Sequence, residues 1–222
     1  QLKNIDLAGQ LSRYLNRSVC VQNDALCAAI GEQHYGAGQG ITDLIHVTLG
    51  TGIGGGLIIN DRPYFGRGGM AMEIGHLQIE SGEPARRCGC GQSGCLEAHA
   101  SATALSRQYQ ESTGKMLTGE ELFQQAESGD HFARQLFEKA GNYLGMALSH
   151  CVKILDIHHI TISGGPIGAW PLLYPHLIES LRSRVLAPQR RAIQVVPSSL
   201  DDQAGILGAA VLALTPSISH PG

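Results

Sequence analysis

The segment from residue 73 to residue 97 constrains this chain more than any other stretch of its sequence. Within it, one histidine is followed by three cysteines that have glycines beside them: His76, Cys88, Cys90 and Cys95. One imidazole and three thiolates form the Cys3His set that a tetrahedral structural zinc accepts, and glycines let a short loop turn around a small ion. The spacing H-x11-C-x-C-x4-C is not one of the common zinc-finger spacings. The pattern predicts a structural zinc site carried by one loop.

A disulfide framework is the alternative interpretation of these cysteines. The chain has six cysteines, and its first residues lack the basic and apolar regions of a secretory signal peptide. Thiols stay reduced inside cells, so clustered cysteines with a histidine indicate a metal in an intracellular chain. The remaining three, Cys20, Cys27 and Cys151, lie in apolar surroundings and are expected to be small core residues.

Composition excludes several classes of protein. The chain has 222 residues, enough for a substantial core, and a net charge of only −3, which gives no general attraction to nucleic acids or anionic membranes. No apolar run reaches the roughly 20 residues that span a bilayer. The 29 glycines, which follow no repeat, suggest tight turns and backbone-lined binding loops. We therefore expect a cytoplasmic, mixed α/β protein without a membrane partner.

Apolar periodicity and turn residues divide the chain into alternating elements. Helices are predicted at 2–16, 25–35, 98–110, 119–126, 131–155, 171–185 and 204–214. Strands are predicted at 19–21, 44–49, 57–59, 158–163 and 193–196. The long helix at 131–155 has an apolar side that could be core or interface, and core is the expectation.

Two loops of this pattern could carry chemistry. Asp24 follows the predicted strand at 19–21 and opens a helix, so helix capping is its favoured role from spacing alone. The carboxyl end of a strand is, however, also where α/β folds bind ligands. The run of residues 50–56, GTGIGGG, is predicted as a glycine-rich turn between two strands, either an anion-binding loop or a plain hairpin. No Gly-Lys-Ser/Thr follows it, which excludes a P-loop.

Four segments together resemble one family. Asn23-Asp24, LGTGIGGG at 49–56, EIGH at 73–76 and CGCGQSGCLEAHAS at 88–101 occur in this order in the ROK family of repressors, open reading frames and kinases. The resemblance covers about residues 2–214. It implies an α/β protein of the actin-like ATPase (ribonuclease H-like) two-lobe fold. It also implies a division into a remainder of the N-terminal lobe at 1–22, a sugar-binding C-terminal lobe at 23–214 and a flexible tail at 215–222.

The same resemblance implies roles for individual residues. Asp24 matches the catalytic base, and the residues that match sugar ligands are Asn23, Glu73, His76 and Glu97. Those that match the ATP and phosphate segments are Thr51, Gly52, Gly54, Gly55, Gly164 and Gly165. The zinc ligands would be His76, Cys88, Cys90 and Cys95, and ATP with magnesium, a small-molecule sugar and a second copy of the chain are the implied cofactors and partners.

Two departures from the family pattern bear on function. The phosphate-binding Asp-x-Gly-Gly-Thr segment of the kinases does not precede Leu2, so we expect part of the first lobe to be missing and this polypeptide alone to have little kinase activity. Met72 stands where the kinases have a glycine, and it is expected to narrow the pocket or to change the path of the loop. The leading hypothesis is an ATP-dependent hexose or amino-sugar kinase. The alternative is the sugar-sensing effector domain of a ROK transcriptional regulator, for which DNA would be a partner through an upstream winged-helix domain.

Overall fold

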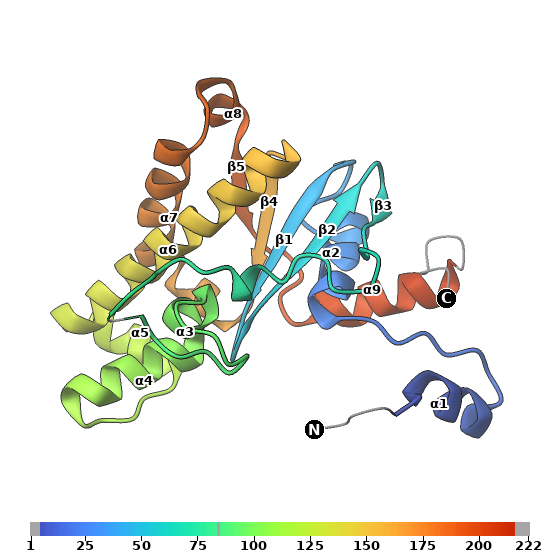
Figure 1. The fold of residues 1–222 in the computed structure, drawn as a ribbon, viewed down its shortest axis with the longest axis horizontal. Coiled ribbons are helices and arrows are strands. Elements are labelled where there is room, and N and C mark those ends of the chain that lie inside the picture. The colour runs from blue at the N-terminus through green and yellow to red at the C-terminus, as the bar shows by residue number, and fades with distance from the viewer. Residues whose placement is uncertain (1–4, 84, 216–222) are drawn as a thin grey trace.

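A mixed β-sheet lies at the centre of the fold, with helices on both faces (Figure 1). The computed structural model describes residues 5–83 and 85–215, so the predicted tail falls outside it except for residue 215. The strands are β1 (Leu44–Leu49), β2 (Ile53–Ile59), β3 (Arg62–Pro63), β4 (His159–Ser163) and β5 (Gln194–Pro197), in the order β3-β2-β1-β4-β5. β2 is antiparallel to β1 and β3, whereas β1, β4 and β5 run parallel. This is the ribonuclease H-like sheet that the resemblance implied.

Helices α2 (Asp24–Tyr35) and α9 (Gln203–Leu214) cover one face of the sheet. Gly54 and Gly56 of β2 face α2, and a Cβ at either position would lie within 2.8 Å of an alanine Cβ on that helix. These glycines were predicted to form part of a turn, and this prediction was wrong, because they belong to strand β2 and allow α2 to approach it closely. Only residues 50–52 form the turn itself.

The other face is covered by α6 (His131–Leu155) and α7 (Trp170–Arg184). Three shorter helices, α3 (Leu96–Ala100), α4 (Ala102–Thr113) and α5 (Gly119–Glu127), pack against α6. The strands contribute Val47, Ile160 and Ile162 to this side, where they belong to one core with residues of α6 such as Phe137. Helix α6 is therefore a core helix, as predicted. None of the helices in the described ranges is long and apolar enough to cross a membrane.

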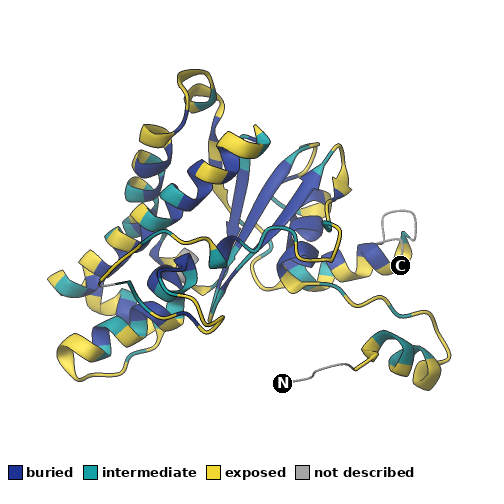
Figure 2. Cartoon of the chain, viewed as in Figure 1, coloured by how far each residue is buried: buried dark blue, intermediate teal, exposed yellow. Residues whose placement is uncertain are grey.

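Two local predictions were wrong, and one helix was missed. The segment predicted as a strand at 19–21 forms no strand with any part of the chain that the structure describes, and its Cys20 is exposed rather than in the core. The helix predicted at 98–110 is broken at Ser101, whose extended backbone and Oγ atom cap the first turn of α4. A further helix, α8 (Ala187–Ala192), was not predicted, because its polar residues show no apolar stripe. Helix α1 (Leu7–Leu15) buries no residue and lies apart from the sheet (Figures 1 and 2).

A buried histidine joins the two central parallel strands. His46 of β1 is fully buried on the face covered by α2, and hydrogen bonds of 2.8 and 3.0 Å join its ring nitrogens to Thr161 Oγ1 and Ser163 Oγ of β4. Burial lowers the pKa of His46 from 6.5 to about 3. The imidazole is therefore neutral in the folded protein, and it fixes the ends of β1 and β4 from which the two glycine turns start.

We expect His46→Gln to reduce the pH dependence of stability. Below pH 6.5 the unfolded chain protonates this histidine while the folded chain does not until about pH 3, so stability is lost as the pH falls through this window. The loss approaches about 1.4 kcal/mol per pH unit. The unfolding free energy should be measured with urea at pH 5.5 and at pH 4.5. Its decrease between these two pH values should be about 1 kcal/mol larger in the wild type than in His46→Gln. His131→Gln, at an exposed position of α6, is the control; equal slopes for all three proteins would contradict the prediction.

Candidate functional site

The structure brings the four predicted metal ligands together. One potential ligand atom from each of His76, Cys88, Cys90 and Cys95 lies within 4.8 Å of all the others. The Sγ atoms of Cys90 and Cys95 are 3.7 Å apart, and Cys88 Sγ lies 3.7 Å from His76 Nδ1. Zinc bonds of about 2.0–2.3 Å in a tetrahedron require ligand separations of about 3.3–3.8 Å. The donor set and these separations fit zinc, and all six cysteines are free, which removes the disulfide interpretation.

The electrostatics of this loop differ between its cysteines. Burial, followed by the neighbouring thiols, raises the pKa of Cys95 to about 12, because a thiolate there would be desolvated and close to other sulfur atoms. The hydrogen bond from the backbone of Gln92 lowers the pKa of Cys90. A divalent cation would supply the positive charge that three converging thiolates need.

His76 presents a different nitrogen to each side. Its Nδ1 atom faces Cys88, while its Nε2 atom lies 3.9 Å from Glu73 Oε2. Metal-binding histidines commonly donate their second N–H to a carboxylate, which fixes the ring orientation. The side chains of Glu73 and His76 are 39% and 36% exposed, so both remain open to a ligand. His76 can therefore hold a metal through one nitrogen and face a ligand with the other.

Glu97 connects the metal loop to the sheet. It lies in the first turn of α3, two residues after Cys95. Its Oε2 atom accepts a hydrogen bond of 3.0 Å from the backbone N–H of Ile53, and Cys88 Sγ lies 3.9 Å from its Oε1 atom. A Cβ at Gly52 would collide with Glu97 Oε2, so a side chain at this position would displace the carboxylate.

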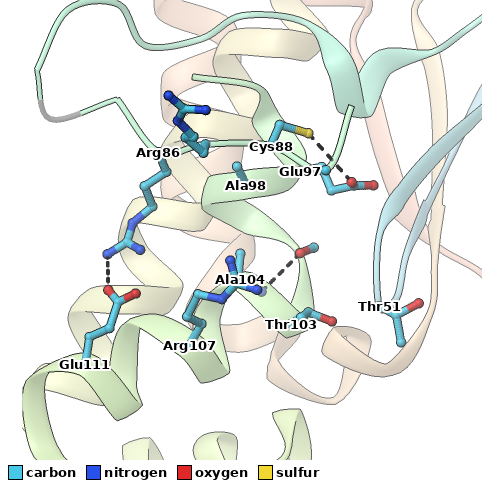
Figure 3. A pocket seen from close by; sticks show the side chains of 12 residues that line it. Thr51, Arg86, Cys88, Glu97, Ala98, Thr103, Ala104, Arg107 and Glu111 are labelled. Carbon is cyan, nitrogen blue, oxygen red and sulfur yellow. Dashed lines mark hydrogen bonds and ion pairs between the residues drawn. The ribbon is translucent and has the colours of Figure 1, made fainter. Parts of the chain in front are cut away.

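A cavity of about 290 Å³ lies between the metal loop and α4 (Figure 3). Cys88 and Glu97 point toward each other at its upper edge, and Thr51 lies across from them. At the far end Arg86 donates a hydrogen bond of 2.7 Å to Glu111, which ties the metal loop to α4. The cavity thus extends from Thr51, which is expected to bind phosphate, to Glu97, which is expected to bind sugar.

Asn23, and not Asp24, caps helix α2. Asn23 Oδ1 accepts hydrogen bonds from Ala25 N and Leu26 N at 2.9 and 3.1 Å, and Asn23 has the extended backbone of an N-cap. Capping was the favoured role for Asp24 from its spacing, and the structure corrects this. Asp24 is the first helical residue, with one carboxylate oxygen 2.8 Å from Ala25 N and its side chain in an exposed position.

Helix α2 and Glu97 approach neighbouring residues of β2. The residue after Asp24, Ala25, packs against Gly54 of β2, and Glu97 hydrogen-bonds to Ile53 at the start of that strand. Helix α2 and Glu97 therefore both contact the first residues of the strand that follows the glycine turn. Gly54 and Gly55 lie within this strand, where Gly55 packs against Met72 and Ile74, so their expected contact with phosphate stays a prediction.

Two glycine turns lie side by side at the ends of β1 and β4. The first is formed by residues 50–52, and the second starts at Gly164, whose φ of 109° is open to glycine but strained for other residues. A Cβ at Gly164 would collide with the carbonyl of Leu49, so the turns are in direct contact. Thr51 and Gly165 line a second cavity, of about 600 Å³, which extends from these turns along α5.

Helix α5 lines this second cavity, and sequence reasoning missed it. Its contributing residues are Gly119, Glu120, Phe123, Gln124 and Glu127. The spacing i, i+3, i+4, i+7 places the last four on one helical face, while Leu122 and Ala126 are buried on the other. The sequence signal was present in this spacing, but residues 118–121 were interpreted only as a helix start.

Met72 has a left-handed backbone conformation of the kind that glycine adopts readily. Its φ is 62°, in the left-handed region that costs a residue with a side chain about 1–2 kcal/mol. Ile74 N donates a hydrogen bond of 2.6 Å to Met72 O, and the methionine side chain packs against the core. The expected narrowing of the pocket or change of loop path stays a prediction, and Glu73 follows Met72 with its side chain partly exposed.

The sheet, the metal-type loop and the two glycine turns define an α/β lobe of the actin-like ATPase class. The chain belongs to the ROK family, whose family model matches residues 1–216. It is 34% identical over 221 residues to a glucokinase of Thermotoga maritima, covering 93% of this chain and 69% of that protein.

Kinases and regulators of the family both have this structure. A ROK glucokinase of Streptomyces griseus, solved with glucose and AMPPNP, matches with a TM-score of 0.82 and 32% identity, over 96% of this chain and 75% of that one. A ROK transcriptional regulator homologous to the E. coli MLC protein matches with a TM-score of 0.87 and 28% identity, over 96% and 56%. The relatives also include an N-acetyl-D-glucosamine kinase of Pectobacterium carotovorum, 32% identical over 216 residues, so the similarity supports a sugar kinase.

Proposed function

We propose that this protein is an ATP-dependent kinase of a hexose or amino sugar. The observation that carries the proposal is the position of Asp24 at the start of α2, where Asn23 satisfies the helix N-terminus in its place. A protein that only senses a sugar has no physical need for a carboxylate held as a base beside a phosphate-binding turn. The glycines of both turns are also retained.

In this proposal each residue of the site has a separate role in the reaction. Asp24 accepts the proton of the sugar hydroxyl as its oxygen attacks the γ-phosphorus of ATP, and the bond to the β-phosphate oxygen breaks. The carboxylates of Glu73 and Glu97 accept hydrogen bonds from the other sugar hydroxyls. His76 and the side-chain amide of Asn23 form further hydrogen bonds with the sugar. The turn at 50–52 contributes backbone N–H groups and the Thr51 hydroxyl to the phosphates.

Zinc would have a structural role. Four protein ligands leave no open position on a tetrahedral ion, so it would fix the loop that carries the sugar-binding carboxylates rather than take part in the reaction. Magnesium bound with ATP would neutralise phosphate charge. The cytoplasmic location and the homodimer remain predictions.

The second candidate is the effector domain of a transcriptional regulator. It is favoured by the match to the regulator structure and by Met72 at a position where the kinases have a glycine. A regulator of this kind would bind the sugar without transferring phosphate.

The decisive experiment measures ADP release by the protein in the full length that its gene encodes, with a panel of hexoses and amino sugars. Sugar-dependent ADP release is the expected result. Tight sugar binding by calorimetry without ADP release would overturn the kinase proposal and favour the regulator.

A further inference from the structure

The cavity between the metal loop and α4 is lined by three arginines, and the proposed reaction uses none of them. Arg86, Arg87 and Arg107 share this cavity of about 290 Å³ with two carboxylates, those of Glu97 and Glu111. Guanidinium groups that lie close together repel one another unless negative charges lie among them. The contacts of these five side chains therefore decide which charge a ligand of the cavity must carry.

Both carboxylates already have partners within the protein. Glu111 accepts a hydrogen bond of 2.7 Å from Arg86. This hydrogen bond lowers the pKa of Glu111, and the nearby charges of Arg86 and Arg107 lower it further. At the other end of the cavity, Glu97 accepts a hydrogen bond from Ile53 N. Arg86 and Glu111 therefore neutralise each other, and two arginines are left.

These two arginines have no partner in the protein. The guanidinium groups of Arg87 and Arg107 form no hydrogen bond or ion pair with any residue that the structure describes. The hydroxyl groups of Thr51 and Thr103, which line the same cavity, also donate to none of the described residues. The cavity thus offers two positive groups and two hydroxyls as free hydrogen-bond donors.

Helix α4 places this positive region beyond the glycine turn. Ala102 N donates a hydrogen bond of 2.9 Å to Gly50 O, so α4 starts beside the turn at 50–52. Thr103 and Arg107 are four residues apart on one helical face, which places Arg107 about 6 Å further along the helix. Figure 3 shows Thr103, Arg107 and Glu111 in this order along α4. Arg107 therefore lies about one helical turn away from the turn that is expected to hold the phosphates of ATP.

A phosphate group fits these donors better than a carboxylate does. Each guanidinium group can donate two parallel N–H bonds to a phosphate, and a phosphate monoester has three terminal oxygens that accept hydrogen bonds. A carboxylate has only two oxygens, so it would leave some of the donors of Arg87, Arg107, Thr51 and Thr103 unused.

We infer that Arg87 and Arg107, together with Thr103, form a second anion site, which binds the phosphate group of a small ligand beside the sugar site. The phosphate is either free or carried by a sugar, since Glu97, which is expected to bind sugar, lines the same cavity. The bound phosphate is not the one that is transferred, because Asp24 is not among the residues that line this cavity. The inference does not depend on phosphoryl transfer and applies equally to a kinase and to a regulator.

The test measures binding of inorganic phosphate, glucose 1-phosphate and glucose 6-phosphate to the full-length protein by calorimetry, without ATP. Arg107→Gln and Arg87→Gln should each weaken the phosphate ligand that binds by about tenfold or more, because each removes charge-assisted hydrogen bonds. Both variants should keep the affinity for the unphosphorylated sugar that the wild type binds. Arg182→Gln, which removes the same charge from an exposed position of α7, should change neither affinity.

The metal content of Arg87→Gln should equal that of the wild type, since Arg87 is next to Cys88 in the chain. Arg107→Gln, on α4, tests the same site without touching the metal loop. Tighter binding of one sugar phosphate than of inorganic phosphate would identify a phosphorylated sugar as the ligand, and equal binding would identify free phosphate. If none of the three ligands binds, or if their affinity survives Arg107→Gln, the inference is wrong while the kinase proposal stands.

Discussion

Asp24→Asn should lower the turnover number of the sugar kinase reaction by about a thousandfold, since general-base catalysis contributes 10²–10⁴. The amide has the same shape as the carboxylate and can still accept the hydrogen bond from Ala25 N. It cannot accept the proton of the attacking hydroxyl. Helix α2 should keep its stability, because Asn23 supplies the cap.

The measurement is steady-state ADP release, with sugar affinity determined separately by calorimetry. Asp43→Asn is the matched control, because Asp43 lies before β1 and hydrogen-bonds to the backbone of Asn60, away from the residues of the site. The variant Asp24→Asn should change kcat strongly and sugar affinity little. Turnover that survives this change would remove Asp24 from the role of base.

Cys88→Ser should remove the metal and with it most of the sugar affinity. The protein should contain about one zinc per chain, and loss of a thiolate leaves three ligands for an ion that requires four. Glu73, His76 and Glu97 would then lose the fixed loop that carries them. We expect sugar affinity to fall by about 10–100-fold, in the range found when the environment of a metal site is disrupted.

Metal content by mass spectrometry and sugar binding by calorimetry should be measured on the same samples. Cys20→Ser is the control, because Cys20 is an exposed cysteine outside the loop, and it should change neither quantity. A protein that is free of metal yet binds sugar normally would show that the four residues are not a structural site.

The comparison of sequence with structure separates two kinds of information. Helices α2, α5, α6, α7 and α9 and strands β1, β4 and β5 were predicted with boundaries within about two residues, because apolar periodicity and caps act locally. The strand at 19–21 was wrong because a strand requires a neighbour to pair with, which no local pattern supplies. Gly54 and Gly56 were placed in a turn because glycine usually breaks a strand, whereas here it makes room for α2.

The sequence alone was enough to predict the Cys3His cluster, since its ligands lie within twenty residues of one another and the chemistry of the side chains is specific. Tertiary structure was needed to show which atom of each site residue contacts a neighbouring residue and which can bind a ligand. It shows that Asn23 takes the capping role and leaves Asp24 as the first helical residue, that His76 turns Nδ1 toward Cys88, and that Glu97 reaches the start of β2. The cavity along α5 likewise exists only because the turn at 50–52, η2 (Gly165–Ala169) and α5 meet in space. Composition and spacing determine which chemistry a chain can perform, but contacts between residues far apart in sequence decide which groups meet.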